Sequence, residues 1–236
     1  MMKKYAFEIT GAIIALFVLM GDIFYILYGA LWRKGVTSAL FLLLGILFFI
    51  LAFLKKKKLR FPIFMLTGLA FTMVADIVLN IHFIAGAILF AVGHIFYAVS
   101  YYQLKEWNWL DLICSFVLAI PAVLWITLAP MFDFGGALME VVVVFYAVII
   151  SFMVGKTISN FIRSILNHQD YRLELILWIG SILFFFSDCM LLLNKFGSFT
   201  KDAKEVLTIL CLASYYPAQI LLASSIGLYS RIDYSK

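Results

Sequence analysis

The segment VTSALFLLLGILFFILAFL, residues 36–54, decides the fold class. It has no charged residue, and as an α-helix rising about 1.5 Å per residue it is long enough to cross the roughly 30 Å hydrocarbon core of a lipid bilayer. Four lysines follow it directly at positions 55–58, where cations can contact lipid head groups. The segment therefore predicts a transmembrane helix.

Apolar segments of similar length recur along the whole chain. Of its 236 residues, 65% are hydrophobic and 13% are charged, whereas soluble domains average about half apolar and about a quarter charged. Continuous apolarity favours helices over barrel strands, which alternate over about ten residues. We predict an all-α polytopic membrane protein whose eight transmembrane helices form one bundle and a single domain, residues 1–236. The predicted spans are about 8–29, 36–54, 61–80, 83–104, 110–129, 135–156, 173–194 and 205–229.

The distribution of basic residues predicts the orientation of this bundle. Of the 18 Lys and Arg residues, 13 lie on the side that carries the N-terminus. Because positively charged loops stay in the cytoplasm, both termini are predicted to be cytoplasmic. The N-terminal apolar segment lacks a convincing cleavage site, so we expect it to remain as the first helix of a cell (plasma) membrane protein. The basic residues behind the net charge of +5 are then expected to contact anionic lipid head groups, and nucleic acid is not an expected partner.

Ionisable side chains within the apolar spans identify a candidate site. A charge at the centre of a membrane helix costs about 2.5–3.5 kcal/mol, so such residues normally face protein or water. Asp22, Asp76, His94 and Asp188 all fall within predicted spans. In the predicted orientation the three aspartates lie on helices that run the same way, each roughly 7–10 Å before the outer end of its helix. They are predicted to share one depth.

Further polar residues recur at helical spacing and so lie on single helix faces. These groups are Thr72, Asp76 and Asn80; His94, Tyr97 and Tyr101; and Tyr215, Tyr216 and Gln219. If the faces converge, they enclose a polar cavity in the outer half of the membrane. The alternative is structural, because such side chains also join neighbouring helices by hydrogen bonds.

Two segments of the sequence form a weak repeat. GLAFTMVAD at 68–76 and GSILFFFSD at 180–188 each place a glycine eight residues before an aspartate. Each is followed by a short turn and another helix with aromatic and polar residues. The two segments run in the same direction, so helices three and four are predicted to repeat in parallel as helices seven and eight.

Five motifs resemble the YhhN family of membrane lysoplasmalogenases. Together they extend the similarity over roughly residues 60–229. Their combined order and spacing identify the family more specifically than any one motif does. In this chain the family's Gly-Asp on the third helix is replaced by Ala75-Asp76, which loosens the match at that point. The motifs are GLAFTMVADIVLN (68–80), GAILFAVGHIFYAVSYY (86–102), FYAVIISFM (145–153), GSILFFFSDCMLLLNKF (180–196) and YYPAQILLASS (215–225).

The resemblance implies hydrolysis of the vinyl ether bond of a lysoplasmalogen to a fatty aldehyde and glycerophosphoethanolamine or glycerophosphocholine, without a cofactor. This chemistry needs a proton on the alkene carbon and then attack by water, steps that two carboxyl groups can serve. We assign Asp76 and Asp188 as acid and base in either order, with one proton shared between them. The predicted substrate-binding or supporting residues are His94, Tyr97, Asn80, Tyr146, Ser187, Tyr215, Tyr216, Gln219 and Asp22.

Other functions remain open at this stage. Intramembrane carboxylates and parallel repeats also suit a proton-coupled transporter of lipids or small solutes, which broken helices would favour. A metal-dependent hydrolase would have to use His94, Asp76 and Asp188, a poor zinc set, and we predict no metal site. The expected partners are a lysophospholipid substrate and membrane lipids, with the oligomeric state left open. The hydrolase prediction depends on Asp76 and Asp188 facing one chamber.

Overall fold

The computed structural model describes residues 2–232, and the side chains from residue 6 onward. This part of the chain has eight α-helices and no strand, and every helix is long and apolar enough to cross a membrane. The predicted all-α membrane fold is therefore confirmed. The helices are α1 (Met2–Tyr28), α2 (Leu31–Leu54), α3 (Arg60–Val78), α4 (Phe83–Tyr102), α5 (Trp109–Leu128), α6 (Ala137–Leu166), α7 (Arg172–Phe196) and α8 (Lys201–Tyr229).

Helix α6 is ten residues longer at its C-terminal end than its predicted span, 135–156. Hydropathy ends the span at Lys156, but this lysine is fully buried against α5. Its Nζ atom lies 2.8 Å from Asp111 Oδ2 and donates to the backbone oxygen of Glu106. One turn further, Asn160 Nδ2 donates to the Tyr101 oxygen. Polar contacts with protein therefore extend the helix past the point where apolar residues end.

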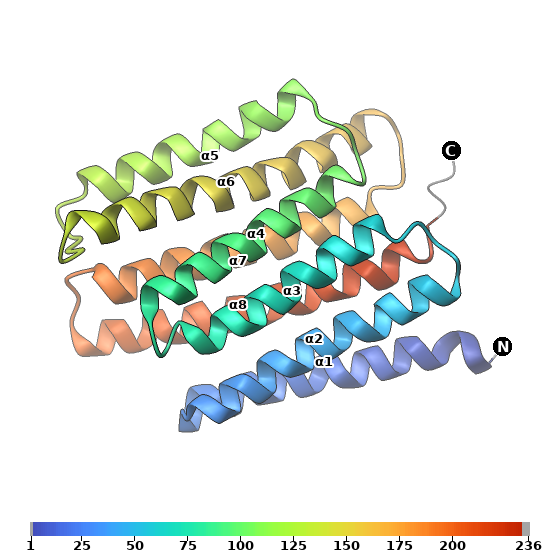
Figure 1. Cartoon of the computed structure of the whole chain (residues 1–236), viewed down its shortest axis with the longest axis horizontal. Helices are drawn as coiled ribbons and strands as arrows, with labels where there is room; N and C mark the ends of the chain where they lie inside the picture. Colours follow the sequence, from blue (N-terminus) through green and yellow to red (C-terminus); the bar gives the residue numbers. More distant parts are fainter. Residues whose placement is uncertain (1, 233–236) are drawn as a thin grey trace.

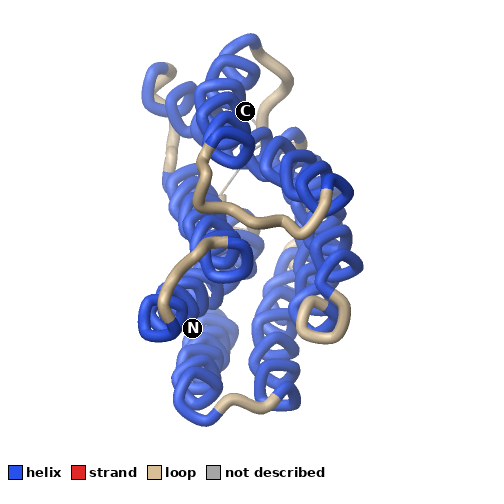
Figure 2. Tube along the Cα trace, turned by 90° about the vertical axis from the view of Figure 1, so that its left-hand side faces the viewer, coloured by secondary structure: helices blue, strands red, loops and turns tan. Residues whose placement is uncertain are grey.

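The helices pack as four successive hairpins, α1–α2, α3–α4, α5–α6 and α7–α8 (Figure 1). Short loops join their ends (Figure 2). Helix α8 packs on α1, α2 and α3 as well as α7, whereas the backbones of α3 and α7 do not come within 8 Å of each other, measured between Cα atoms. Helix α5 packs mainly on α6, and its side chains also line a hollow with α7. The bundle thus places α8 between the two helices that carry Asp76 and Asp188.

The beginning of α1 and the end of α8 lie at the same face of the bundle. Arg231 Nη2 lies 3.3 Å from Glu8 Oε1, and Tyr229 donates to the backbone oxygen of Lys58 at the end of α2. A chain that crosses the bundle an even number of times begins and ends at the same face. Which side of a membrane this face occupies stays a prediction.

Candidate functional site

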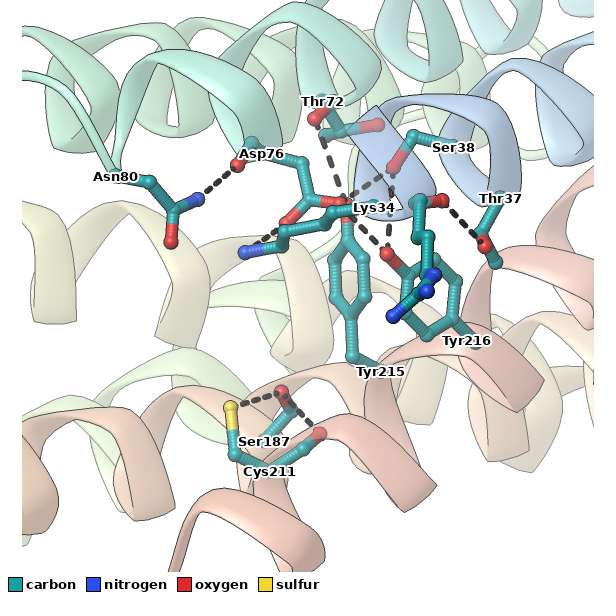
Figure 3. A network of polar contacts seen from close by, with 11 residues as sticks. Lys34, Thr37, Ser38, Thr72, Asp76, Asn80, Ser187, Cys211, Tyr215 and Tyr216 are labelled. Carbon is teal, nitrogen blue, oxygen red and sulfur yellow. Dashed lines mark hydrogen bonds and ion pairs between the residues drawn. The ribbon is translucent and has the colours of Figure 1, made fainter. Parts of the chain in front are cut away.

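Asp76 lies at the centre of a buried polar network near the end of α3 (Figure 3). Its Oδ1 atom forms an ion pair with Lys34 Nζ at 2.8 Å. Ser38 Oγ donates to Asp76 Oδ2 at 2.5 Å, and the Tyr216 hydroxyl donates to the same oxygen at 3.0 Å. We call these four residues the Asp76 network. Lys34 and Ser38 lie one turn apart on α2, so both side chains face α3.

The sequence prediction did not include Lys34 or Ser38. The predicted second span begins at residue 36, which left Lys34 in a loop, but α2 begins at Leu31 and Lys34 is only 6% exposed. A usable signal was present. Lys34, Ser38 and Phe41 follow the i, i+4, i+7 spacing of a buried face, and all three are buried. The lysine therefore continues the packed stripe of α2.

Asp22 on α1 is a second carboxyl group near the Asp76 network. It is 4% exposed and lies within electrostatic range of Asp76 and Tyr216. Helix α1 approaches α2 closely here, because a Cβ on Gly21 would lie 2.5 Å from Thr37 Oγ1. Within the described chain, Asp22 Oδ1 has no hydrogen-bond partner. Asp22 thus joins Asp76 and does not contact Asp188.

Asp188 on α7 has a different set of partners, which we call the Asp188 network. The Tyr146 hydroxyl from α6 donates to Asp188 Oδ2 at 2.6 Å. His94 Nε2 from α4 lies 3.9 Å from the same oxygen, within ion-pair range but too far for a hydrogen bond. His94 is fully buried against the Phe184 ring, and neither of its ring nitrogens has a hydrogen-bond partner among residues 6–232.

The structure thus places Asp76 and Asp188 in two separate networks: α2 and α8 supply the partners of Asp76, and α4 and α6 supply those of Asp188. No hydrogen bond or ion pair joins the two aspartates in the described part of the chain. Their distances from the ends of their helices differ, while the common depth of the two aspartates stays a prediction. Asp76 lies two residues before the end of α3, and Asp188 eight residues before the end of α7. At about 1.5 Å per residue these are roughly 3 Å and roughly 12 Å.

Tyr215 lies between the two networks. Its hydroxyl donates to the Thr72 backbone oxygen at 3.4 Å, its ring packs edge-on against Phe184, and it contacts the ring of Tyr216. Ser187 points away from Asp188, because its hydroxyl donates to the Cys211 backbone oxygen on α8. Of these predicted supporting residues, Tyr215 and Tyr216 lie close to a carboxyl network, while Ser187 joins α7 to α8.

The remaining predicted residues form a third cluster and a cap. The Tyr97 hydroxyl donates to Gln219 Oε1 at 2.9 Å and shares a hydrogen bond with the Thr72 hydroxyl. This cluster joins α3, α4 and α8. Asn80 lies just beyond the end of α3, where its Nδ2 atom donates to the backbone oxygen of Asp76 at 2.7 Å. Asn80 thus holds the backbone of the aspartate and does not contact its carboxylate.

Three hollows lie beside these networks. A polar cavity of about 330 Å³ opens near the ends of α3 and α7, and two apolar hollows of about 50 Å³ each flank Asp188 and Tyr146. The polar cavity and the first apolar hollow share Leu79, Phe83 and Leu191, so the two adjoin. The polar cavity is lined by Tyr25, Lys34, Leu79, Asn80, Phe83, Leu191, Asn194, Lys195, Thr208, Cys211 and Leu212.

Metal binding has no set of ligands in the described residues, where no three His, Cys, Asp or Glu side chains come together. His94 lies with one aspartate, Asp188, and Asp76 pairs with lysine instead.

Comparison with known proteins gives a family. Searches of curated proteins and of solved structures found no match. The model of the YhhN family matches residues 36–226, a region that includes both aspartates, His94 and α8, and excludes Asp22 and Lys34. The match covers most of the chain and agrees with the motifs around Asp76, His94 and Asp188. The chain therefore belongs to the YhhN family.

Proposed function

We propose that this protein is a membrane-embedded hydrolase that cleaves the vinyl ether bond of lysoplasmalogens, releasing a fatty aldehyde and glycerophosphoethanolamine or glycerophosphocholine. The family supports the proposal. The observation that carries it is the position of Asp188, a carboxyl group in an apolar hollow that adjoins a polar cavity. A lysoplasmalogen has the same division, with a polar head group on one side of the reactive bond and a hydrocarbon chain on the other.

The surroundings of the two aspartates suggest different roles. Among residues 6–232, no lysine or arginine pairs with Asp188, which accepts one hydrogen bond from Tyr146 and lies 3.9 Å from His94 Nε2. Burial among apolar side chains favours an uncharged carboxylic acid, which can give up a proton. Asp76 forms an ion pair with the ammonium of Lys34 at 2.8 Å. We therefore assign Asp188 as the acid and Asp76 as the base.

The proposed reaction balances in three steps. Asp188 transfers its proton to the alkene carbon remote from the ether oxygen, which leaves an oxocarbenium ion. Water adds to that ion and loses a proton to Asp76, giving a hemiacetal. The hemiacetal then breaks its bond to the glycerol oxygen, which takes up the hydroxyl proton. Water carries the proton from Asp76 back to Asp188, since no hydrogen bond joins the two aspartates among the described residues. Tyr146 fixes the Asp188 carboxyl group in position, and His94 lies 3.9 Å from the same carboxyl oxygen.

The test is aldehyde release from a lysoplasmalogen by purified protein, measured by mass spectrometry. Asp188→Asn and Asp76→Asn are each expected to reduce the rate at least about a hundred-fold, the usual contribution of a positioned acid or base. Asp202→Asn is the matched control, since Asp202 lies exposed in the first turn of α8. All variants are checked to be folded at the assay temperature, because Asp76→Asn also removes one partner of a buried ion pair and lowers stability. Full activity in either site variant removes that aspartate from the chemistry.

A transporter is the second candidate, and the same protein can test it. Broken helices would favour it, but within residues 2–232 each span is one continuous helix, including α5 with Pro121 and α8 with Pro217. Vesicles containing the protein are therefore expected to release aldehyde. Uptake of lysoplasmalogen without any aldehyde would support a carrier and exclude the hydrolase.

A further inference from the structure

The polar cavity has the chemistry of an anion site. Two lysines line it, Lys34 and Lys195, and no carboxylate does so in the described part of the chain. Lys34 donates one of its three N–H groups to Asp76, so two remain for another acceptor. Asp76 offsets much of the charge of Lys34, which leaves Lys195 as the uncompensated cation at the rim.

Both lysines are held over the cavity by neighbouring side chains. The Nζ atom of Lys195 lies 5.4 Å from the centre of the Phe83 ring, and that of Lys34 lies 5.7 Å from the Tyr25 ring. The rim is further fixed by Asn194, whose Nδ2 atom donates to the Lys204 backbone oxygen and to Thr208. Such ordering lowers the entropic cost of binding a ligand.

The position and size of the cavity fit a phospholipid head group. Its lining comes from the last turn of α1, the first turn of α2, the end of α3, the start of α4 and the end of α7, all at one face of the bundle, and from Thr208, Cys211 and Leu212 of α8, two to three turns deeper. Lipid phosphates lie at this level, just outside the hydrocarbon core. The volume of about 330 Å³ far exceeds the roughly 10–15 Å³ that one water molecule needs.

We propose that this cavity binds the phosphate of the head group of a lysophospholipid, with Lys195 at the rim and Lys34 at the base as the two donors. The choice of a lipid phosphate rests on the proposed function and on the apolar hollow that adjoins the cavity at Leu79 and Phe83. A phosphate seated between the lysines places the glycerol carbons at this junction and the hydrocarbon chain beside Asp188.

The test measures binding without turnover. The probe is a 1-O-alkyl-glycerophosphoethanolamine, whose saturated ether has no alkene to protonate, and binding is measured as a ligand-dependent rise in unfolding temperature at fixed detergent concentration. The comparison lipid is a 1-O-alkylglycerol with the same chain and no phosphate. Inorganic phosphate and glycerophosphoethanolamine are tested alone to separate a lipid site from a site for free phosphate.

Lys195→Gln is expected to weaken binding of the phosphate lipid about five-fold, the value of one exposed charge-assisted hydrogen bond, and to leave the alkylglycerol unchanged. Lys34→Met is expected to weaken binding of the phosphate lipid more than Lys195→Gln does. Lys201→Gln, an exposed lysine at the start of α8 outside the cavity, is the matched control and should change neither lipid.

Equal affinity of Lys195→Gln and the wild-type protein for the phosphate lipid overturns the proposal, as does an equal loss for both lipids. Inorganic phosphate that binds as tightly as the lysolipid overturns its assignment to a lipid. Because no bond is broken in this assay, a lysine-dependent result stands even if aldehyde is never released, and an active hydrolase with lysine-independent binding refutes the phosphate site alone.

Discussion

The ion pair between Lys34 and Asp76 is the residue-scale feature with the largest expected effect on stability. Both side chains are less than a tenth exposed. Removing one partner of a buried pair leaves an uncompensated charge, which costs about 3–5 kcal/mol, while removing both costs much less. The pair joins α2 to α3, and we expect the protein to be less destabilised when both side chains are replaced than when only one is.

Lys34→Met is expected to lower the free energy of unfolding by about 3 kcal/mol or more, and the double variant Lys34→Met/Asp76→Asn to recover a large part of this loss. The measurement is equilibrium unfolding in detergent of the wild type, both single variants and the double variant. Lys201→Met serves as the control with an exposed lysine. Strict additivity of the two single effects would contradict a coupled buried pair.

The energetic cost of burying a charge predicted which ionisable residues are buried better than it predicted which side chains they contact. It correctly placed Asp22, Asp76 and His94 inside protein, where all three are buried. It could not assign Lys34 to Asp76 or Tyr146 to Asp188, because each pair joins two helices whose contact the sequence does not specify. The shared proton expected between Asp76 and Asp188 stays a prediction, and no hydrogen bond joins them within residues 2–232.

At the scale of elements, two glycines let α3 and α4 approach closely. A Cβ on Gly68 would lie 2.5 Å from the ring of Tyr97, and one on Gly93 would lie 2.7 Å from Thr72 Cγ2. The Tyr97 ring cannot move aside freely, because its hydroxyl is bonded to Thr72 and Gln219. The third polar cluster thus depends on the absence of side chains at these positions.

Gly68→Ala is expected to destabilise the protein by about 1–3 kcal/mol through overpacking, although alanine is the better helix former. Gly35→Ala is the matched control, since its Cβ would meet nothing closer than Ile77 at 3.7 Å. Unfolding temperature in detergent measures both. A neutral Gly68→Ala would mean that α3 and α4 separate at little cost.

The sequence predicted the number and order of the helices because each span carries its own hydropathy signal. Their ends were harder to predict where polar residues continue a helix. Lys34 lies in the first turn of α2, and Lys156 and Asn160 lie in the last turns of α6, all buried against protein. Hydropathy detects contact with lipid, so it misses helical turns that are stabilised by contact with other helices.

For the whole molecule, orientation is the open prediction. The ion pair between Glu8 and Arg231 puts both chain ends at one face, and the excess of Lys and Arg predicts that this face is cytoplasmic. Green fluorescent protein fused after residue 236 is expected to fluoresce in bacteria, and alkaline phosphatase fused there to be inactive. A fusion within the loop at 197–200 should give the reverse. Active phosphatase at the C-terminus would contradict the orientation.

The sequence did not predict how the helices are arranged relative to one another. Adjacent helices were expected to pair, and they do, but nothing in the periodicity indicated that α8 separates α3 from α7. That choice depends on how Tyr215, Tyr216 and Gln219 fill the space between four helices. In place of one common chamber, the structure has a polar cavity lined by Lys34, the partner of Asp76, and an adjoining apolar hollow lined by Asp188.

The second apolar hollow beside Asp188 has a kinetic consequence. It lies between α5, α6 and α7 and includes the exposed ring of Trp125. A hydrocarbon tail can therefore reach Asp188 sideways, without passing through water. For the proposed hydrolase, the quantity that governs velocity is then the mole fraction of substrate among the surrounding amphiphiles. Diluting a fixed amount of substrate with inert detergent should slow the enzyme, although the molar concentration in the tube is unchanged.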